Sequence, residues 1–142
     1  MAIEVTGVAP LVQVFHMPTA IRFYRDKLGF RVTGNSKPKT GDPDDVDWAM
    51  LELGGATVML NTAYDPDDVP ERPDAARWSG HQDTCLYLDC PDVDAAYREL
   101  AARGVELDPP KVAWYGMKQL YLKDPDGFGI CFQWKAEPPG EE

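Results

Sequence analysis

Two histidines and three cysteines are the side chains in this sequence most able to perform acid–base or nucleophilic chemistry: His16, His81, Cys85, Cys90 and Cys131. Imidazole titrates near neutral pH, and a thiolate is both a nucleophile and a ligand for soft metals. His81 and Cys131 are therefore the candidate catalytic residues, as acid/base and nucleophile. The alternatives are a solvated loop histidine and a cysteine that packs as a small apolar residue. We find no Ser/His/Asp constellation and no glycine-rich phosphate loop.

Charge and composition restrict the classes of partner. A net charge of −10 on 142 residues argues against nucleic acid and permits a cationic ligand, although acidity can also serve solubility alone. There is no apolar run long enough to span a membrane, and Met1 to Gly7 does not resemble a secretory signal. Three cysteines without CxxC spacing indicate neither a disulfide framework nor a zinc knuckle. We therefore expect a cytoplasmic protein without nucleic-acid or membrane partners.

The stretch from Lys123 to Trp134 predicts a β-hairpin. Its centre, Asp124-Pro125-Asp126-Gly127, combines a fixed φ, side chains that bond local N–H groups, and a glycine that tolerates positive φ. Apolar residues alternate on both sides of this turn with the period of two expected of strands. One face of the hairpin is apolar. The other face carries a polar and aromatic mixture of Gln119, Tyr121, Cys131 and Gln133.

The first half of the chain predicts one helix and several strands. The expected elements are a strand over 8–15, a helix over 17–28 that ends at Gly29, a strand from Phe30, a long mobile loop over 34–45, and strands over 48–53 and 56–61. Gly54-Gly55 suits the turn between the last two strands, and it sets Met50 opposite Met59. Trp48, Met50 and Met59 then lie on the face away from the helix, where they could contact a ligand or simply complete a core.

The second half predicts a similar series. A strand over 84–89 precedes a helix over 93–101 with Asp92 as N-cap, then a short strand over 105–107 and the final hairpin. Between the halves, Tyr64 to Gly80 is acidic and rich in proline, and it is predicted to be a loop that links or covers.

The order β-α-β-β-β therefore occurs twice, with Gly29-Phe30 and Gly104-Val105 lying 75 residues apart (104 − 29). We predict an α+β domain over 1–142 that contains modules at 7–62 and 83–134, a linker loop at 63–82 and a disordered acidic tail at 135–142. Each module makes a curved mixed sheet with a helix on one face, and the opposite faces can enclose a shared cavity.

These motifs resemble the vicinal oxygen chelate superfamily, which includes glyoxalase I, bleomycin-resistance proteins and extradiol dioxygenases. The resemblance covers about Gly7 to Trp134 and rests on Ala20 to Phe30, on Asp92 to Tyr97 leading to Arg103-Gly104-Val105, and on Asp124 to Gly127. It implies paired βαβββ modules and a homodimer, and it does not specify one reaction. His16 stands where relatives have a helix-capping aspartate, so we expect it to be a capping or surface residue.

Metal-dependent relatives carry His, Glu or Gln ligands on the first and last strands of each module. The corresponding positions here are Ala9, Met59, Cys85 and Cys131. Alanine cannot bind a metal and a thioether is a poor ligand for a hard cation. Two thiolates could hold a soft metal, but such a site lacks further ligands. We expect a site without a metal and without a cofactor.

The leading hypothesis is a binding protein that captures a small cationic or aromatic compound, as bleomycin-resistance proteins do, with resistance to an antibiotic as one implied role. Aromatic faces provide stacking and cation–π attraction. A glyoxalase-like lyase or isomerase is the first alternative, and a structural or interaction module with a closed cavity is the second. The candidate ligand-binding residues are Trp48, Met50, Met59, Asp83, Cys85, Tyr87, Trp114, Tyr115, Tyr121, Cys131 and Gln133.

Overall fold

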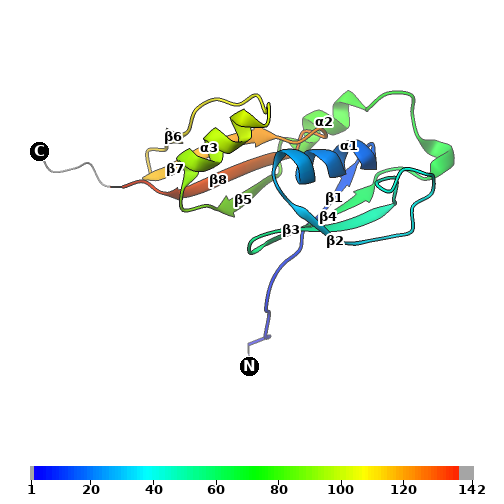
Figure 1. Cartoon of the computed structure of the whole chain (residues 1–142), viewed down its shortest axis with the longest axis horizontal. Coiled ribbons are helices and arrows are strands. Elements are labelled where there is room, and N and C mark those ends of the chain that lie inside the picture. The colour runs from blue at the N-terminus through cyan, green and yellow to red at the C-terminus, as the bar shows by residue number, and fades with distance from the viewer. Residues whose placement is uncertain (1, 138–142) are drawn as a thin grey trace, which may run out of the picture. The chain divides into compact units, whose positions relative to one another are not determined.

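The computed structural model describes residues 2–137. The chain divides into two compact units between Glu71 and Arg72, a position inside the predicted linker 63–82. Each unit contains one four-stranded mixed sheet with a helix on one of its faces (Figure 1). The predicted α+β architecture of two βαβββ modules is confirmed. None of the helices in residues 2–137 is long and apolar enough to cross a membrane.

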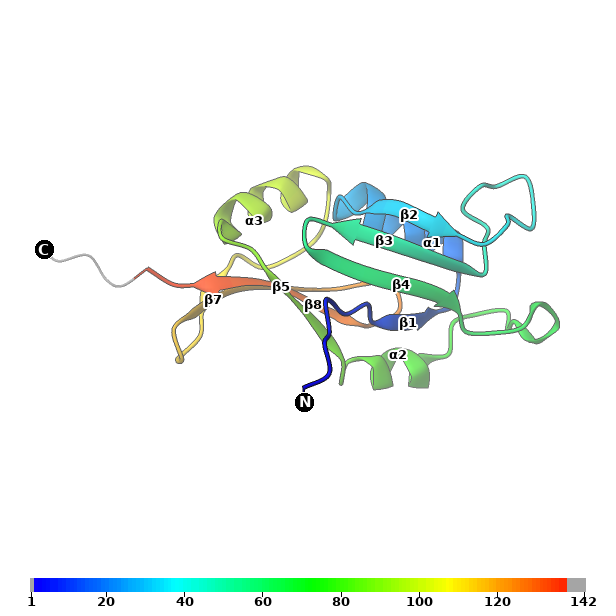
Figure 2. The ribbon, with the colours of Figure 1, turned by 90° about the horizontal axis from the view of Figure 1, so that it is seen from below.

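The first unit follows the predicted order of elements. They are β1 (Leu11–Val14), α1 (Met17–Arg22), a π-helical turn (Phe23–Lys27), β2 (Arg31–Asn35), β3 (Trp48–Leu53), β4 (Ala56–Thr62) and a short 3-10 helix (Pro66–Asp68). The sheet order is β1-β4-β3-β2, with β1 parallel to β4 and the other pairs antiparallel (Figure 2). β1 is shorter than the strand predicted over 8–15, because Val8 is 83% exposed and no strand pairing begins before Leu11.

The local signals of the first unit act as predicted. The Nδ1 atom of His16 accepts a hydrogen bond from the backbone N–H of Thr19 at 3.3 Å, so the capping role expected for His16 is confirmed. Gly29 ends the helical segment with φ 91°, a left-handed conformation that glycine adopts without steric cost. The Gly54-Gly55 turn sets Met50 opposite Met59, as the sequence indicated. The face of the sheet toward α1 is apolar and buried, with Val12, Val14, Leu51, Val58 and Leu60.

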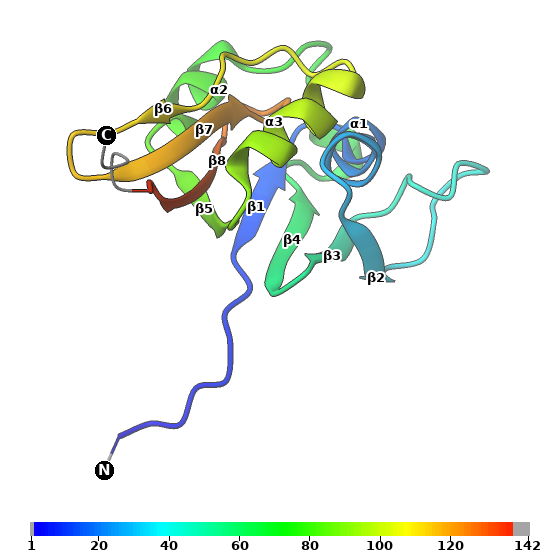
Figure 3. The same ribbon diagram turned by 60° about the vertical axis from the view of Figure 1, so that its left-hand side comes forward.

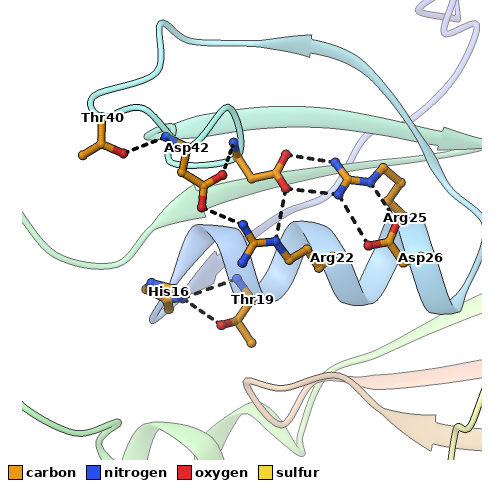
Figure 4. Close-up of polar contacts among 8 residues, drawn as sticks. His16, Thr19, Arg22, Arg25, Asp26, Thr40 and Asp42 are labelled. Atoms are coloured by element: carbon orange, nitrogen blue, oxygen red, sulfur yellow. Dashed lines mark hydrogen bonds and ion pairs between the residues drawn. The ribbon is translucent and has the colours of Figure 1, made fainter.

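The segment between β2 and β3 is tied to the α1 region instead of forming the mobile loop that we expected. Arg22 pairs with Asp42 at 2.6 Å, and Arg25 pairs with Asp44 at 2.9 Å. Figure 4 shows these arginines reaching from the helix to the loop. Val46, in the same segment, is fully buried. The sequence spacing did not reveal these pairs, because the partners are about twenty residues apart along the chain.

The second unit contains one helix more than the sequence predicted. Its elements are α2 (Ala75–His81), β5 (Cys85–Asp89), α3 (Val93–Ala102), β6 (Lys111–Val112), β7 (Met117–Lys123) and β8 (Gly129–Lys135). The sheet order is β5-β8-β7-β6, and α3 packs on β7 and β8 (Figure 3). Asp92 caps α3 by accepting a hydrogen bond from the N–H of Ala95 at 2.9 Å, as predicted.

Three boundaries in this unit require correction. The predicted strand over 105–107 is absent, because the N–H of Val105 bonds the carbonyl of Leu100 and completes the end of α3. The edge strand instead follows the two prolines as β6. The predicted loop over 63–82 contains α2, whose N-cap Asp74 accepts from the N–H of Ala76. The second module was predicted to end at 134, but β8 continues one residue further, to Lys135, the first residue of the predicted tail. Residues 138–142 of that tail lie outside the described residues.

Helix α2 is docked on the β7–β8 turn. The His81 ring stacks on Phe128 with 3.9 Å between ring centroids, and its Nδ1–H donates to the carbonyl of Asp126 at 2.7 Å. Gly127, at φ 89°, lies so close to Trp78 that an added Cβ atom would overlap the carbonyl oxygen of Trp78 and come within 3.0 Å of its ring. The glycine of the predicted turn therefore provides both the positive φ and the room for α2.

Candidate functional site

The face of the second sheet opposite α3 gathers most of the sequence-predicted ligand residues of this unit. Strand alternation places Tyr87, Gln119, Tyr121 and Gln133 on this face, and the β6–β7 loop adds Tyr115. We call these five residues the tyrosine–glutamine face. Cross-strand register arranges it in two rows: Tyr87 and Tyr121 flank Cys131, and Gln119 lies directly opposite Gln133.

The two tyrosines form an exposed aromatic pair. Their hydroxyl groups are hydrogen-bonded at 3.0 Å, and their rings meet edge to face with 6.1 Å between centroids. Tyr87 is 52% exposed and Tyr121 is 47% exposed. The hydrogen bond with Tyr87 raises the pKa of Tyr121 above its ordinary value, so this phenol is neutral at physiological pH. The pair therefore offers ring surface to a ligand without adding charge.

The two glutamines form a polar pair beside the tyrosines. The Nε2 group of Gln119 donates to the Oε1 of Gln133 at 2.9 Å and to the hydroxyl of Tyr115 at 2.7 Å. Gln119 is buried, and Gln133 is half-buried. The sequence placed Gln119 on this face by alternation, but not among the ligand candidates. The available signal was the alternation itself, which places Gln119 on the same face as Tyr121 and Gln133.

The loop between β6 and β7 adds further aromatic surface. A turn closed by the hydrogen bond from the N–H of Gly116 to the carbonyl of Ala113 brings Tyr115 to Gln119. Trp114, in the same turn, is 95% exposed and stacks edge to face on Tyr115 with 5.3 Å between centroids. An exposed tryptophan supported by another ring suits contact with an aromatic ligand.

Cys131 lies between the tyrosines and is fully buried. Burial is the main cause that raises the pKa of its thiol to about 11. The thiol is therefore protonated at neutral pH, a state that does not favour the nucleophilic role considered from the sequence. Cys85, on the same face, is half-buried, and burial also raises its pKa. All three cysteines are free thiols.

The positions that correspond to metal ligands do not suit a divalent ion. Ala9 has no donor atom, Met59 offers a thioether, and Cys85 and Cys131 are thiols held in the neutral form by burial. Within residues 2–137, no group of three or more His, Cys, Asp or Glu side chains could hold a metal.

Two further candidates lie away from the tyrosine–glutamine face. His81 is engaged with Phe128 and Asp126 at the β7–β8 turn. Asp83 is exposed in the loop before β5. Cys85, which begins β5, pairs with Gly129, whereas Gln133 pairs with Asp89 at the other end of β5. The register therefore places His81 and Asp83 at the end of the sheet near the β7–β8 turn, whereas the glutamine pair lies at the other end.

In the first unit, Trp48, Met50 and Met59 lie on the face of the sheet away from α1, as predicted. All three are half-buried, and the Trp48 ring passes over Gly34 at 3.7 Å from the position of an added Cβ. Their role in ligand binding and the shared cavity both stay predictions.

Comparisons with known proteins agree with this architecture. The family model described as the Glyoxalase/Bleomycin resistance protein/Dioxygenase superfamily matches residues 7–132. A glyoxalase/bleomycin resistance protein/dioxygenase from Nocardioides has a similar structure, with 18% identity, a TM-score of 0.69 and coverage of 100% of this chain and 92% of that chain. None of the curated proteins matches the chain.

Two of the similar structures are ligand-binding proteins by name. The antibiotic-binding protein TnmS3 from Streptomyces sp. CB03234 is 25% identical, with a TM-score of 0.66 and coverage of 96% of this chain and 99% of that chain. A bleomycin-binding protein in complex with bleomycin is 16% identical, with a TM-score of 0.65 and coverage of 92% and 99%. At 16% identity, the second likeness shows the fold alone.

Proposed function

The chain belongs to the glyoxalase/bleomycin resistance protein/dioxygenase superfamily, and from that premise we propose that it binds a small, partly aromatic molecule and releases it chemically unchanged. The observation that carries the proposal is the tyrosine–glutamine face, where two half-exposed tyrosine rings adjoin a hydrogen-bonded glutamine pair. Aromatic rings with a few placed polar groups are typical of sites for small organic ligands.

The chemistry of the same residues supports capture over catalysis. General acid–base or nucleophilic work requires a group that changes protonation near the operating pH. The Tyr121 phenol and the Cys131 thiol both have pKa values raised well above neutrality, Tyr121 chiefly by its hydrogen bond with Tyr87 and Cys131 chiefly by burial. Glutamine does not titrate. These groups can orient a ligand, but they do not exchange protons with it at pH 7.

Long-range charge adds a preference among ligands. The net charge of −10 attracts a cationic guest more strongly than an anionic guest of the same shape. TnmS3, whose name describes it as an antibiotic-binding protein, is the similar structure with 25% identity, and this supports an antibiotic-like compound as the ligand. Sequestration of such a compound is the role that we propose.

The test is a titration of the purified protein with a panel of cationic and neutral aromatic compounds, followed by tryptophan fluorescence. We expect Tyr87→Ala to weaken binding roughly 3- to 10-fold, the effect of losing one aromatic contact. Tyr97→Ala, on α3, is the matched control and should bind as the wild type does. Recovery of the compound with unchanged mass after long incubation separates binding from a glyoxalase-like reaction. No response to any compound of the panel, or an altered product, would contradict the proposal.

A further inference from the structure

The glutamine pair has hydrogen-bonding capacity that the described residues do not use. Gln119 donates both of its N–H bonds, one to Gln133 and one to Tyr115. Among residues 2–137, no partner is found for the Oε1 of Gln119 or the Nε2 of Gln133. One carbonyl acceptor and one N–H₂ donor therefore remain open, one on each member of the hydrogen-bonded pair.

This conclusion does not depend on how the two amides are oriented. Oxygen and nitrogen of a glutamine side chain are assigned from the hydrogen-bond network. If both amides are turned over, Gln133 donates to Gln119, and the Tyr115 hydroxyl donates to Gln119 as well. Turning only one amide over would bring two donors or two acceptors together. In either consistent arrangement, one donor and one acceptor are left open.

Both open atoms keep contact with solvent. No side-chain nitrogen or oxygen in the described part of the chain is both buried and without a hydrogen-bond partner. The open atoms of Gln119 and Gln133 have no such partner, so each keeps some solvent-accessible surface, although most of the Gln119 side chain is buried. Each open atom belongs to one of the two amide groups that make the shared hydrogen bond.

The tyrosine row lies next to this open donor and acceptor. Gln133 follows Cys131 by two residues on the same face of β8, and Gln119 precedes Tyr121 by two residues on β7. Two residues of a strand span roughly 7 Å. A flat bicyclic compound that rests on the tyrosine rings therefore extends to the glutamine pair with its rim.

We infer that the glutamine pair selects aromatic compounds whose rim carries a hydrogen-bond donor next to an acceptor, as in a ring lactam. This inference rests on the proposed function and names the class of ligand for the same face. The open N–H₂ group donates to the lactam carbonyl, and the open amide oxygen accepts from the lactam N–H. A ligand that lacks the donor leaves the amide oxygen desolvated and unpaired, which costs affinity.

Calorimetric titration with three bicyclic probes tests the inference: 2-quinolinone, its N-methyl derivative, which has lost the donor, and protonated 2-aminoquinoline, which presents two donors. For the wild type we expect 2-quinolinone to bind roughly 5- to 100-fold more tightly than the N-methyl derivative. Gln133→Met, which keeps the length of the side chain, should abolish this preference.

Gln133→Glu supplies a gain of specificity that misfolding cannot imitate. The carboxylate still accepts from Gln119 and adds a second acceptor at the rim, so the variant should prefer protonated 2-aminoquinoline to 2-quinolinone. Equal binding of the lactam and its N-methyl derivative by the wild type, with both weakened by Tyr87→Ala, would refute the inference and leave the proposed function standing. Failure of all three probes to bind at millimolar concentration would refute the inference, and failure of every compound of the aromatic panel as well would overturn the proposed function.

Discussion

Gly127→Ala should destabilise the second unit more than another left-handed glycine does, because it both strains the backbone and displaces α2. An alanine in the left-handed region costs about 1–2 kcal/mol, and Gly127 has φ 89°. The new methyl group would also overlap the Trp78 carbonyl. Trp78 is 37% exposed, so undocking it loses at most roughly 150 Å² of buried surface, or about 4 kcal/mol. We expect a total loss of about 2–5 kcal/mol.

Gly116→Ala is the matched control for this change. Gly116 has φ 87°, and no atom lies within 4 Å of an added Cβ. Only the backbone strain of about 1–2 kcal/mol should appear. Urea unfolding followed by circular dichroism measures both variants. Tryptic cleavage after Arg77 reports undocking of α2, and it should accelerate in Gly127→Ala alone. Equal destabilisation of the two variants, with unchanged cleavage, would refute the docking of α2 on the turn.

Three further outcomes follow from single side chains. Burial raises the pKa of Cys131 to about 11. The neutral thiol therefore contributes its full stabilisation below the unfolded pKa of about 8.5, and this contribution is lost as the pH rises through 11. At pH 8 a thiol reagent should label the other two cysteines first, and fast labelling of Cys131 would contradict its burial. His16→Ala removes the cap of α1 and should cost about 0.5–1 kcal/mol in urea unfolding, whereas an equal loss in His16→Asp would argue against capping. The hydrogen bond from the backbone N–H of Asp44, and to a lesser extent the Arg22 guanidinium, lowers the pKa of Asp42. The ionised Asp42 carboxylate therefore stabilises the fold above the unfolded pKa of about 4, and this contribution is lost as the pH falls. Asp42→Asn should therefore flatten the acid limb of the stability profile, and an unchanged limb would exclude this carboxylate.

Features that depend on neighbouring residues were predictable from the sequence. The turn at Gly54-Gly55, the turn over 124–127 and the caps at His16 and Asp92 all satisfy backbone groups within a few residues. Gly29, Gly54 and Gly127 were recognisable as turn or helix-end glycines, because few other residues adopt a positive φ readily. The repeated order of elements then followed from the spacing of these signals.

Features that depend on distant partners were not predictable in the same way. The α2 sequence looked like a polar loop, because its stabilising contacts come from Gly127 and Phe128 on another hairpin. The loop over 34–45 looked mobile, because the two arginines that pair with its carboxylates lie about twenty residues earlier in the chain. Val105 looked like the start of a strand, although its N–H completes the end of α3. A single sequence contains both partners of such contacts, but not their proximity.

Local sequence patterns were enough to predict the two βαβββ modules, their turns and the face on which Tyr121, Cys131 and Gln133 lie, because a strand alternates its side chains with a period of two. The hydrogen bonds between Tyr87 and Tyr121 and between Gln119 and Gln133 became visible in the folded sheet alone. The register between strands sets these contacts, and it arises from packing of the whole sheet. The protonation of the central thiol is likewise a tertiary property, because burial raises the pKa of Cys131.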